Sequence, residues 1–542
     1  MERAQLEKLF DRGLLSRGQF VAGLAGLGVT AAGLERLLGV TTGPVDAQTD
    51  TAQYFCLIVL DAFRPDYMQM APMPHLEALG KRGTSYDFAW VAQLESETPT
   101  GHATLSTGSV PRNDGIIGFE WRDPKSGKEA RDGWPPGVLA GDMERDLRAS
   151  GADSIPLAIK AADPAAKVAT MSSEKVYAAD AMGGWAADYI FYHHRTATHL
   201  VPRAVPGHEP PAEFFRRPKL SLKLPRTRLT NWDYLSTMLA LAALADFKPR
   251  ALMVNMPGCD FYGHPYGGPA SPKVMGTVAA GIDRNIGRIV QAYQAAGISD
   301  QTLFVVTADH GMVPNDRAVP GSTTMSTVKH NGGQYLFHTG GTAADIYLKN
   351  RLGAQEVAAA MARVPNVAAS YYQTLTNGAY SYELSASSSI PSDLDDAYRY
   401  LLSTFSGPTA PDVVAPFREN TIGSAEKTAH GDHGGLNWGA QHIPLFIAGP
   451  GVRPGATSHF PARLEDVAPT VLQLLGLASP DMDGTVLADC LGNASAAQVS
   501  AQEALRGPLT AHQAALITQA ETDIAQDQKA GIHPPPALPM KP

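Results

Sequence analysis

Short apolar runs that end beside aspartate or histidine are the feature that most constrains this chain. Asp309 and His310 follow Thr302–Thr307, and the apolar, β-branched composition of that run predicts a buried strand. In α/β proteins the carboxyl ends of parallel strands meet at one edge of the sheet, where ligands bind. The sequence therefore predicts an α/β fold in which these side chains gather at one edge of a central sheet.

The same pattern occurs at three other places. The runs and their neighbouring residues are Leu57–Leu60 with Asp61, Ala251–Met256 with Asp260 and His264, and Pro444–Gly449 with the preceding His433. A single Asp after a strand is usually a turn former or a helix cap, but three Asp and three His beside strands need another explanation. Zinc binds imidazole and carboxylate, and two-metal sites stabilise displacements at phosphorus. We therefore expect two divalent metal ions.

A hydroxyl-rich segment supplies candidate nucleophiles for such a site. Glu95–Gly108 is rich in Ser, Thr and Gly and leads into Ala103–Ser106, which we expect to open a helix. A hydroxyl at a helix N-terminus lies where backbone N–H groups can meet a phosphate, and metal binding makes a hydroxyl a better nucleophile. The alternative is a capped helix start without chemistry. Because the predicted metal ligands need a nucleophile nearby, we favour the interpretation that this segment supplies it.

Several segments together resemble one known family. In chain order they are Val59–Asp66, Thr98–Gly108, Pro257–His264, Thr307–Met312, Gly431–Gly434, Glu465–Gly476 and Met482–Gly484. They resemble the alkaline phosphatase superfamily and, within it, the type I phosphodiesterase and nucleotide pyrophosphatase branch, between residues 53 and 490. The resemblance implies an alkaline phosphatase-like α/β fold, with a mostly parallel central sheet, helices on both faces and cap-type insertions.

The resemblance also implies a role for each site residue. Three residues would hold one metal and four the other, namely Asp260, His264 and His433 for the first and Asp61, Thr98, Asp309 and His310 for the second. Relatives place the nucleophile four residues before the His of a Gly-His pair, here His102, so Thr98 is the expected nucleophile and Thr100 the alternative. Thr98 would form a phospho-threonine that water hydrolyses. Zinc is the expected metal, but Mn or Fe can use the same ligands.

Two departures from the family pattern bear on the substrate. Phe119 stands where many relatives carry a phosphoryl-binding Asn, and Lys175 stands alone where monoesterases carry a Lys and an Arg. A phosphomonoester dianion has more charge to neutralise than a diester. We therefore expect a phosphodiesterase or nucleotide pyrophosphatase that acts on a small anionic phosphoester. Phe119 and Trp121 are candidate apolar contacts to that substrate.

Three alternatives are weighed against this function. A phosphomonoesterase or phosphonate hydrolase on the same fold is the main one, and the missing donors count against the monoesterase. A sulfatase needs Cys or Ser in a Cys/Ser-x-Pro-x-Arg context, whereas this chain has Thr98-Pro-Thr100. A binding protein without chemistry is disfavoured, because all six metal ligands and a hydroxyl nucleophile are present.

Composition and organisation fit a large enzyme. The chain has 542 residues, 44% of them hydrophobic, which allows a substantial core. We expect a catalytic domain at residues 48–490, with insertions near 119–230 and 313–430, and a helical and Pro-rich tail at 491–542. The net charge of −9 argues against binding of a nucleic-acid polymer through a basic field. Three cysteines do not make a disulfide framework.

Residues 1–47 resemble an export signal. Basic residues precede an apolar, Gly/Ala-rich stretch at 20–34 that is too short for a membrane span, and Val45–Ala47 resembles a cleavage site. Leu15–Phe20 resembles a twin-arginine signal in which Gly18 replaces the second Arg. We therefore expect export to the periplasm or the extracellular space, and no stable membrane span unless this segment stays uncleaved.

Overall fold

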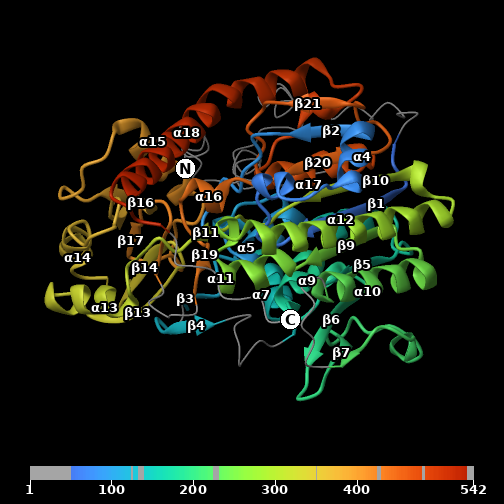
Figure 1. Ribbon diagram of the computed structural model, residues 1–542, viewed down its shortest axis with the longest axis horizontal. Helices are drawn as coiled ribbons and strands as arrows, with labels where there is room; N and C mark the ends of the chain where they lie inside the picture. The colour runs from blue at the N-terminus through green and yellow to red at the C-terminus, as the bar shows by residue number, and fades with distance from the viewer. Residues whose placement is uncertain are drawn as a thin grey trace, which may run out of the picture.

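The structure of the protein is a computed structural model that describes residues 51–123, 126–131, 140–223, 231–349, 351–423, 429–478 and 482–533. The export signal expected at 1–47 and the Pro-rich end of the tail lie outside these residues. Figure 1 shows two large sheets side by side, one of ten strands and one of five, with helices packed around them. Among the described helices, none is long and apolar enough to cross a membrane.

The ten-stranded sheet has a parallel centre and antiparallel neighbours. Its order is β21-β2-β20-β10-β1-β9-β5-β6-β7-β8. The parallel centre consists of β10 (Thr302–Thr307), β1 (Tyr54–Leu60), β9 (Ala251–Met256), β5 (Val168–Met171) and β6 (Tyr189–Arg195). The outer strands are β20 (Leu445–Ala448), β2 (Gly83–Tyr86) and β21 (Ala456–Ser458) on one side, and β7 (His199–Ala204) and β8 (Leu222–Lys223) on the other. The predicted α/β sheet is confirmed, although β20 runs antiparallel to β10.

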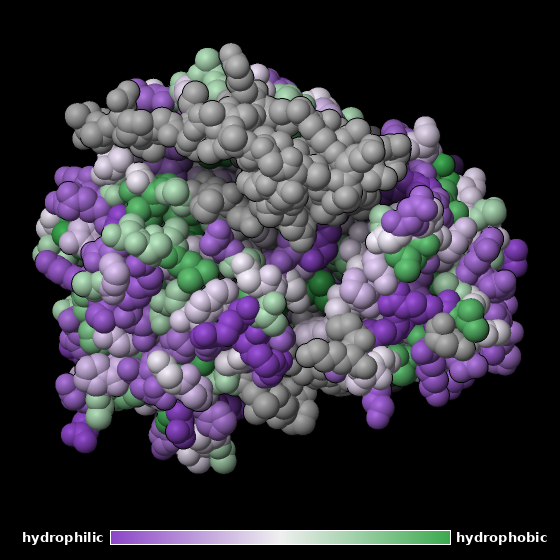
Figure 2. All heavy atoms as spheres, turned by 180° about the vertical axis from the view of Figure 1, so that it is seen from behind, coloured by the Kyte–Doolittle hydropathy of each residue, from purple (hydrophilic) through white to green (hydrophobic). Residues whose placement is uncertain are grey.

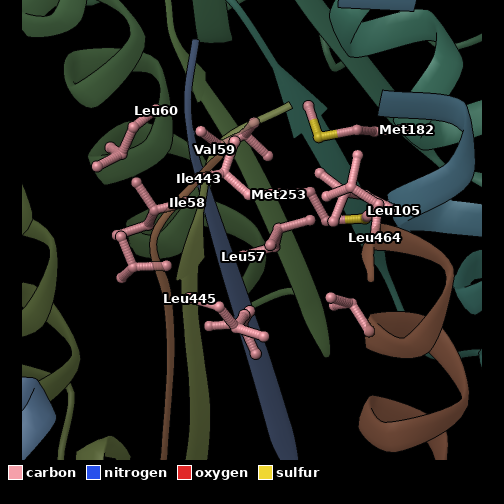
Figure 3. Packing of buried hydrophobic residues seen from close by; sticks show 14 of the residues in the cluster. Leu57, Ile58, Val59, Leu60, Leu105, Met182, Met253, Ile443, Leu445 and Leu464 are labelled. Carbon is pink, nitrogen blue, oxygen red and sulfur yellow. The ribbon is translucent and has the colours of Figure 1, made fainter. Parts of the chain in front are cut away.

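Strand β1 lies in the middle of this sheet and is buried on both faces. Phe55–Leu60 is fully buried, as expected for an apolar parallel strand that is covered on both sides. In Figure 3, Leu57 points toward Leu105 of α5 (Thr98–Thr107), whereas Ile58 points the other way. Apolar side chains therefore pack against both faces of β1 and hold this strand, and the residue that follows it, in place.

Helices pack around the sheet in two groups. One group consists of α4 (Pro74–Arg82), α10 (Asn231–Phe247), α11 (Gly258–Tyr266) and α12 (Pro272–Ala295). The other consists of α5, α7 (Asp142–Ser150), α8 (Ile155–Ala162), α9 (Val176–Gly183) and α17 (Val467–Leu474). The site described below draws residues from both groups, through α11 and α5.

A separate antiparallel sheet lies within residues 313–430. Its order is β13 (Tyr335–Thr339), β14 (Ala343–Leu348), β17 (Val413–Pro416), β15 (Tyr371–Thr376) and β16 (Ala379–Leu384). The helices α13 (Gly321–His330), α14 (Ala354–Met361) and α15 (Ser392–Ser403) pack beside it. It has an apolar cluster of its own, which includes Ile346 and Val413. This sheet brings the β13–β14 connection toward the ends of the central strands.

The long helix α18 (Ala496–Lys529) runs along one side of the molecule and reaches both sheets (Figure 1). The Ser495 side chain caps its first turn. The helix packs against α15 and α16 (Trp438–Gln441). Its buried carboxylates Asp523 and Asp527 pair with Arg418 and Arg317, respectively. These ion pairs attach the end of α18 to the region that carries the five-stranded sheet.

The surface carries mixed side chains. On the face shown in Figure 2, hydrophilic and hydrophobic residues are interspersed. Among the described residues, the exposed large hydrophobics are Phe88, Leu352, Leu375 and Val499, and scattered apolar residues of this kind are normal on a protein surface. The three cysteines are buried, free thiols.

Candidate metal centre and active site

The central strands bring the predicted ligands to one edge of the sheet. Strand β1 pairs in parallel with both β9 and β10, so the chain leaves all three strands on the same side. Asp61 directly follows β1, and Asp309 and His310 come shortly after β10. Asp260 lies in α11, which begins just after β9. All four side chains are buried.

The six predicted ligands form two adjacent groups, which are Asp260 with His264 and His433, and Asp61 with Asp309 and His310. Within each group, one potential ligand atom from each residue lies within 4.8 Å of the others. His264 lies one turn after Asp260 on α11, and His433 follows β19 (Gly431–Asp432). The rings of His310 and His433 stack with their centroids 3.7 Å apart, so the two groups touch.

All three imidazole rings turn Nε2 toward the carboxylates. Each Nδ1 lies beside a backbone carbonyl oxygen, at 3.0 Å for His264 and Gly431, 2.9 Å for His310 and Gly311, and 3.2 Å for His433 and Ser96. A carbonyl oxygen only accepts hydrogen bonds, so Nδ1 carries a proton and Nε2 is the nitrogen that is left to bind a metal ion. Metal-binding histidines are commonly held in this way.

The first group requires a positive charge at its centre. Nε2 of His264 and of His433 lie 3.3 Å and 3.2 Å from Oδ1 of Asp260, an oxygen without a hydrogen-bond partner among the described residues. Lone pairs that face a carboxylate oxygen repel it unless a proton or a metal ion lies between them. Although burial opposes it, the Asp260 carboxylate raises the pKa of His264 to about 9. These residues fit a divalent cation, and their nitrogen and oxygen donors suit zinc.

The second group crowds two carboxylates together. Burial and the neighbouring Asp309 raise the pKa of Asp61 to about 7. Oδ1 of Asp61 lies 3.6 Å and Oδ2 of Asp309 lies 3.4 Å from Nε2 of His310. The backbone N–H of Ala62 donates to Oδ1 of Asp309, and the other oxygen of this carboxylate, Oδ2, faces His310. A divalent cation would neutralise both carboxylates, so this group fits one as well.

Thr98 lies at the first position of α5, beside the second group. The sequence predicted a helix opening at Ala103, but α5 begins at Thr98, because Glu97 and Thr100 form a capping box. Oγ1 of Thr98 lies 3.2 Å from Nε2 of His310, at the positive end of the helix dipole. The Thr100 hydroxyl donates to backbone carbonyls instead, including that of Glu97 at 2.8 Å.

Lys175 joins the two groups to the Thr98 hydroxyl. Its Nζ lies 2.8 Å from Oδ1 of Asp61, 2.7 Å from Oδ2 of Asp260 and 3.2 Å from Oγ1 of Thr98. Burial alone would lower the pKa of Lys175, but the carboxylates of Asp260 and Asp61 raise it well above its usual range. The ammonium is therefore charged and adjacent to the hydroxyl. Sequence analysis noted the lysine, but not these contacts between distant segments.

A pocket of about 340 Å³ opens over Thr98 and Lys175. Phe119 and Tyr177 line it, together with His338 of β13 on the five-stranded sheet. Sequence analysis assigned no role to His338, because nothing in the local sequence shows that β13 reaches this pocket. His338 and the neighbouring Gly340 thus show that the five-stranded sheet contributes part of the pocket wall.

Trp121 is not among the residues that line this pocket, and its expected contact with the substrate stays a prediction. It lines a separate cavity of about 590 Å³, together with Arg112 and Phe405. This larger cavity contains none of the six predicted ligands and no threonine of the α5 start. Its size alone does not connect it with the chemistry at Thr98.

A buried chain of hydrogen bonds lies behind the second group. The Ser172 hydroxyl donates to Oδ1 of Asn255 at 2.8 Å, and Nδ2 of Asn255 lies 2.9 Å from Nε2 of His102. Nδ1 of His102 lies 2.8 Å from the carbonyl oxygen of Thr98 and therefore carries the proton. Sequence analysis did not find Asn255, because it lies within the apolar run of β9, where a packing role was the obvious interpretation.

Comparison with known proteins identifies the family. The family model for type I phosphodiesterase and nucleotide pyrophosphatase matches residues 55–436, which is more than two thirds of the chain. The chain belongs to this family. The family expected from the sequence segments is therefore confirmed.

Individual relatives are distant. An uncharacterised pyrophosphatase/phosphodiesterase of Schizosaccharomyces pombe is 22% identical over 258 residues, which cover 48% of this chain and 44% of the relative. The chain spans less than half of the length of each of the curated relatives that it matches.

Solved structures share the fold. The alkaline phosphatase PafA matches with a TM-score of 0.63 and 18% identity, over 82% of this chain and 99% of that protein. An inactive Thr-to-Ala variant of murine ectonucleotide pyrophosphatase/phosphodiesterase 5 in complex with AMP matches with a TM-score of 0.54 and 18% identity, over 80% and 97% of the two chains. The expected alkaline phosphatase-like fold is confirmed.

Proposed function

We propose that the protein is a metal-dependent phosphohydrolase, most specifically a phosphodiesterase or nucleotide pyrophosphatase that acts through a phospho-threonine intermediate. The observation that carries this proposal is the position of the Thr98 hydroxyl. It lies at the start of α5, 3.2 Å from both Nε2 of His310 and Nζ of Lys175, and it faces the pocket. The murine ectonucleotide pyrophosphatase/phosphodiesterase 5 is inactive when one of its threonines is replaced by Ala, which supports a threonine nucleophile on this fold.

Two divalent cations, expected to be zinc, would be held by the two groups, which are Asp260, His264 and His433 and Asp61, Asp309 and His310. Thr98, whose hydroxyl lies 3.2 Å from Nε2 of His310, would complete the second set of ligands. When bound, they would neutralise phosphoryl oxygens and lower the pKa of a bound hydroxyl. The donor types, the buried charge and the shared His tautomer all support this assignment.

The proposed reaction consists of two successive displacements at phosphorus. Oγ1 of Thr98 bonds to phosphorus as the bond to the leaving oxygen breaks, and the hydroxyl proton passes to that leaving oxygen. The Lys175 ammonium offsets the negative charge that develops beside it. Water then bonds to phosphorus as the bond to Oγ1 breaks, one proton of that water returns to Oγ1, and the second product is released. Thr100 is not suited to the first step, because its hydroxyl accepts from the Glu97 N–H in the capping box and donates to the backbone carbonyls of Glu95 and Glu97.

The second candidate is a phosphomonoesterase or phosphonate hydrolase that uses the same residues. Its support is the likeness to PafA, an alkaline phosphatase, whose TM-score of 0.63 exceeds the 0.54 of the murine phosphodiesterase. Against it, Lys175 is the one lysine or arginine side chain that lines the described pocket. A single cationic side chain suits the single negative charge of a diester better than the dianion of a monoester.

Replacement of each threonine tests the nucleophile. Thr98→Ala should lower turnover of a chromogenic phosphodiester by roughly 10³-fold or more, while both metals stay bound. Thr100→Ala is the matched control and should keep most of the turnover, with lower thermal stability from the lost cap. Loss of turnover in Thr100→Ala alone, with normal metal content in both variants, would contradict the assignment of Thr98.

We also propose that the protein is exported through residues 1–47, with cleavage after Ala47. The support is the basic start, the apolar stretch and the small residues before Gln48. Sequencing the N-terminus of protein purified from its own cells should find Gln48 first. Met1 at the start of the mature chain would contradict cleavage.

A further inference from the structure

A cavity of about 470 Å³ opens at the edge of the central sheet opposite the candidate metal ligands. The parallel strands β1, β5 and β9 begin at this edge, whereas Asp61 and Asp260 lie beyond the carboxyl ends of β1 and β9. Tyr54 starts β1, Lys167 and Arg250 directly precede β5 and β9, and all three line the cavity. The cavity shares no residue with the pocket that holds the proposed nucleophile.

Arg250 has a charged side chain without an ionic partner. Among the described residues, no carboxylate pairs with its guanidinium, and its Nε is buried without an acceptor. Two backbone hydrogen bonds hold the residue between β5 and β1, because its N–H donates to the Lys167 carbonyl at 2.8 Å and its carbonyl accepts from the Phe55 N–H at 2.7 Å. A guanidinium that is partly removed from water and unpaired favours a bound anion.

Positive charge exceeds negative charge around the cavity. Lys248 is exposed just after the end of α10 and, like the arginine, has no carboxylate partner among the described residues. The Lys167 ammonium lies 2.9 Å from Asp188, but the same carboxylate also pairs with Lys160 at 2.6 Å. Asp163 is the one carboxylate among the described residues of the lining. The cavity is therefore suited to an anion.

A dianionic phosphoryl group fits these donors. The planar guanidinium of Arg250 can donate two parallel hydrogen bonds to one phosphate, and the Lys248 ammonium adds a second positive charge. A cation after a helix also suits the helix dipole, but this does not explain the unpaired arginine. The volume of about 470 Å³ lies in the range of sites for small organic molecules, so a substituent on the phosphoryl group has room.

We propose that Arg250 and Lys248 bind a dianionic phosphoryl group at this edge of the sheet. Two sources share that chemistry, namely inorganic phosphate and a phosphomonoester such as the one that remains when a diester is cleaved. The site does not depend on the chemistry at Thr98, because the two sites have no residue in common. The protein would therefore hold phosphate here in addition to any phosphate at the active site.

Isothermal titration calorimetry with inorganic phosphate counts the bound ions. The protein is loaded with zinc and then freed of unbound zinc. Arg250→Met removes the guanidinium but keeps the backbone hydrogen bonds, and it should bind one phosphate ion fewer than the unmodified protein. Lys248→Met changes an exposed side chain and should weaken the affinity for that ion by roughly tenfold or more.

Two controls separate this site from the active site. The inhibition constant of phosphate for diester hydrolysis should be the same in Arg250→Met and unmodified protein, because the active site keeps all of its residues. Arg284→Met is the matched substitution, since Arg284 is exposed on α12 and does not line the cavity. It should keep the number and affinity of the bound ions, and a thermal melt of each variant confirms that it is folded.

The source of the phosphoryl group follows from a second titration. Phenyl phosphate replaces inorganic phosphate, in a Thr98→Ala background that does not cleave it. Loss of one bound phenyl phosphate on adding Arg250→Met assigns the site to phosphomonoesters. Loss of a bound ion with inorganic phosphate alone assigns it to free phosphate.

Two results would overturn the inference. The first is an equal number of phosphate ions, bound with equal affinity, in unmodified protein, folded Arg250→Met and folded Lys248→Met. The second is displacement of the phosphate from this site by an equal concentration of acetate, because a single negative charge would then suffice. Absence of diester hydrolysis would contradict the proposed function and would leave this count of bound phosphate unchanged, so the two failures are distinguishable.

Discussion

Asn255 donates a hydrogen bond from its side-chain amide to Oδ2 of Asp61, over 2.9 Å. The Ser172 hydroxyl holds the other end of that amide, so its NH₂ group faces Asp61 and His102. His102 in turn lies 3.2 Å from Oδ2 of Asp309. One buried amide therefore orients both carboxylates of the second ligand group without being a ligand itself.

Removal of this amide should weaken metal binding. Asn255→Leu keeps the approximate size of the side chain but loses both donated hydrogen bonds, so Asp61 is free to rotate. Loss of an outer hydrogen-bond partner typically costs about 10–100-fold in metal affinity. Competition of zinc-loaded protein against a chelator measures this directly.

Asn113→Leu is the control for that substitution. The Asn113 amide also donates to an aspartate, Asp483, but neither residue belongs to a ligand group. It should leave zinc affinity unchanged. Equal affinities for Asn255→Leu and unmodified protein would show that Asp61 does not depend on this contact.

Loss of the Lys175 charge should slow the reaction. Lys175→Met keeps an unbranched side chain but removes the ammonium that lies beside Thr98 and both ligand groups. Removing one preorganised electrostatic group typically costs about 10²–10³-fold in kcat. The measurement is steady-state hydrolysis of a diester by protein with verified metal content. An unchanged kcat would show that the Lys175 charge does not contribute to the reaction.

A buried ion pair should stabilise the junction between the β3 strand (Glu120–Arg122) and the five-stranded sheet. Arg122 forms two hydrogen bonds with Asp412 and donates to the Leu348 carbonyl at 2.6 Å. Asp412→Ala leaves the buried guanidinium without its carboxylate, which typically costs about 3–5 kcal/mol. Urea unfolding measures the loss. The double variant Arg122→Met with Asp412→Leu should recover part of it, and no difference between single and double variants would contradict this account.

Asp114 should make the protein less stable as the pH rises. Burial raises the pKa of its carboxyl to about 8, whereas an unfolded Asp titrates near about 3.9. Between these values the folded state binds more protons than the unfolded state, so stability falls as pH increases. Asp114→Asn should reduce this decline, since an amide oxygen can still accept from the Ile116 N–H. Parallel stability curves from pH 5 to pH 9 would contradict this assignment.

The clustering of the six candidate ligands could be predicted, because each of them follows or precedes a recognisable apolar run. An apolar run such as Thr302–Thr307 forces a buried strand, and a parallel sheet brings the ends of such strands together. The start of α5 was placed too late, because the capping box of Glu97 and Thr100 is stronger than the apolar signal that begins at Ala103. Helix start positions depend on such side-chain contacts, which composition does not show.

Contacts between distant segments could not be predicted in the same way. Asn255 sits in an apolar strand, and only the register of β9 against β1 turns its amide toward Asp61. Phe119 and Trp121 are close in sequence but line different cavities, because Phe119 precedes β3 while Trp121 lies within it. Which way such a side chain points depends on the backbone that surrounds it.

The central claim is that a threonine and two ligand groups cleave phosphodiesters with metal. The most direct test is hydrolysis of methyl 4-nitrophenyl phosphate beside 4-nitrophenyl phosphate, on zinc-loaded protein with and without a chelator. The account predicts activity that the chelator abolishes and a higher kcat/KM for the diester. A higher kcat/KM for the monoester, or activity that persists after the metal has been removed, would contradict it.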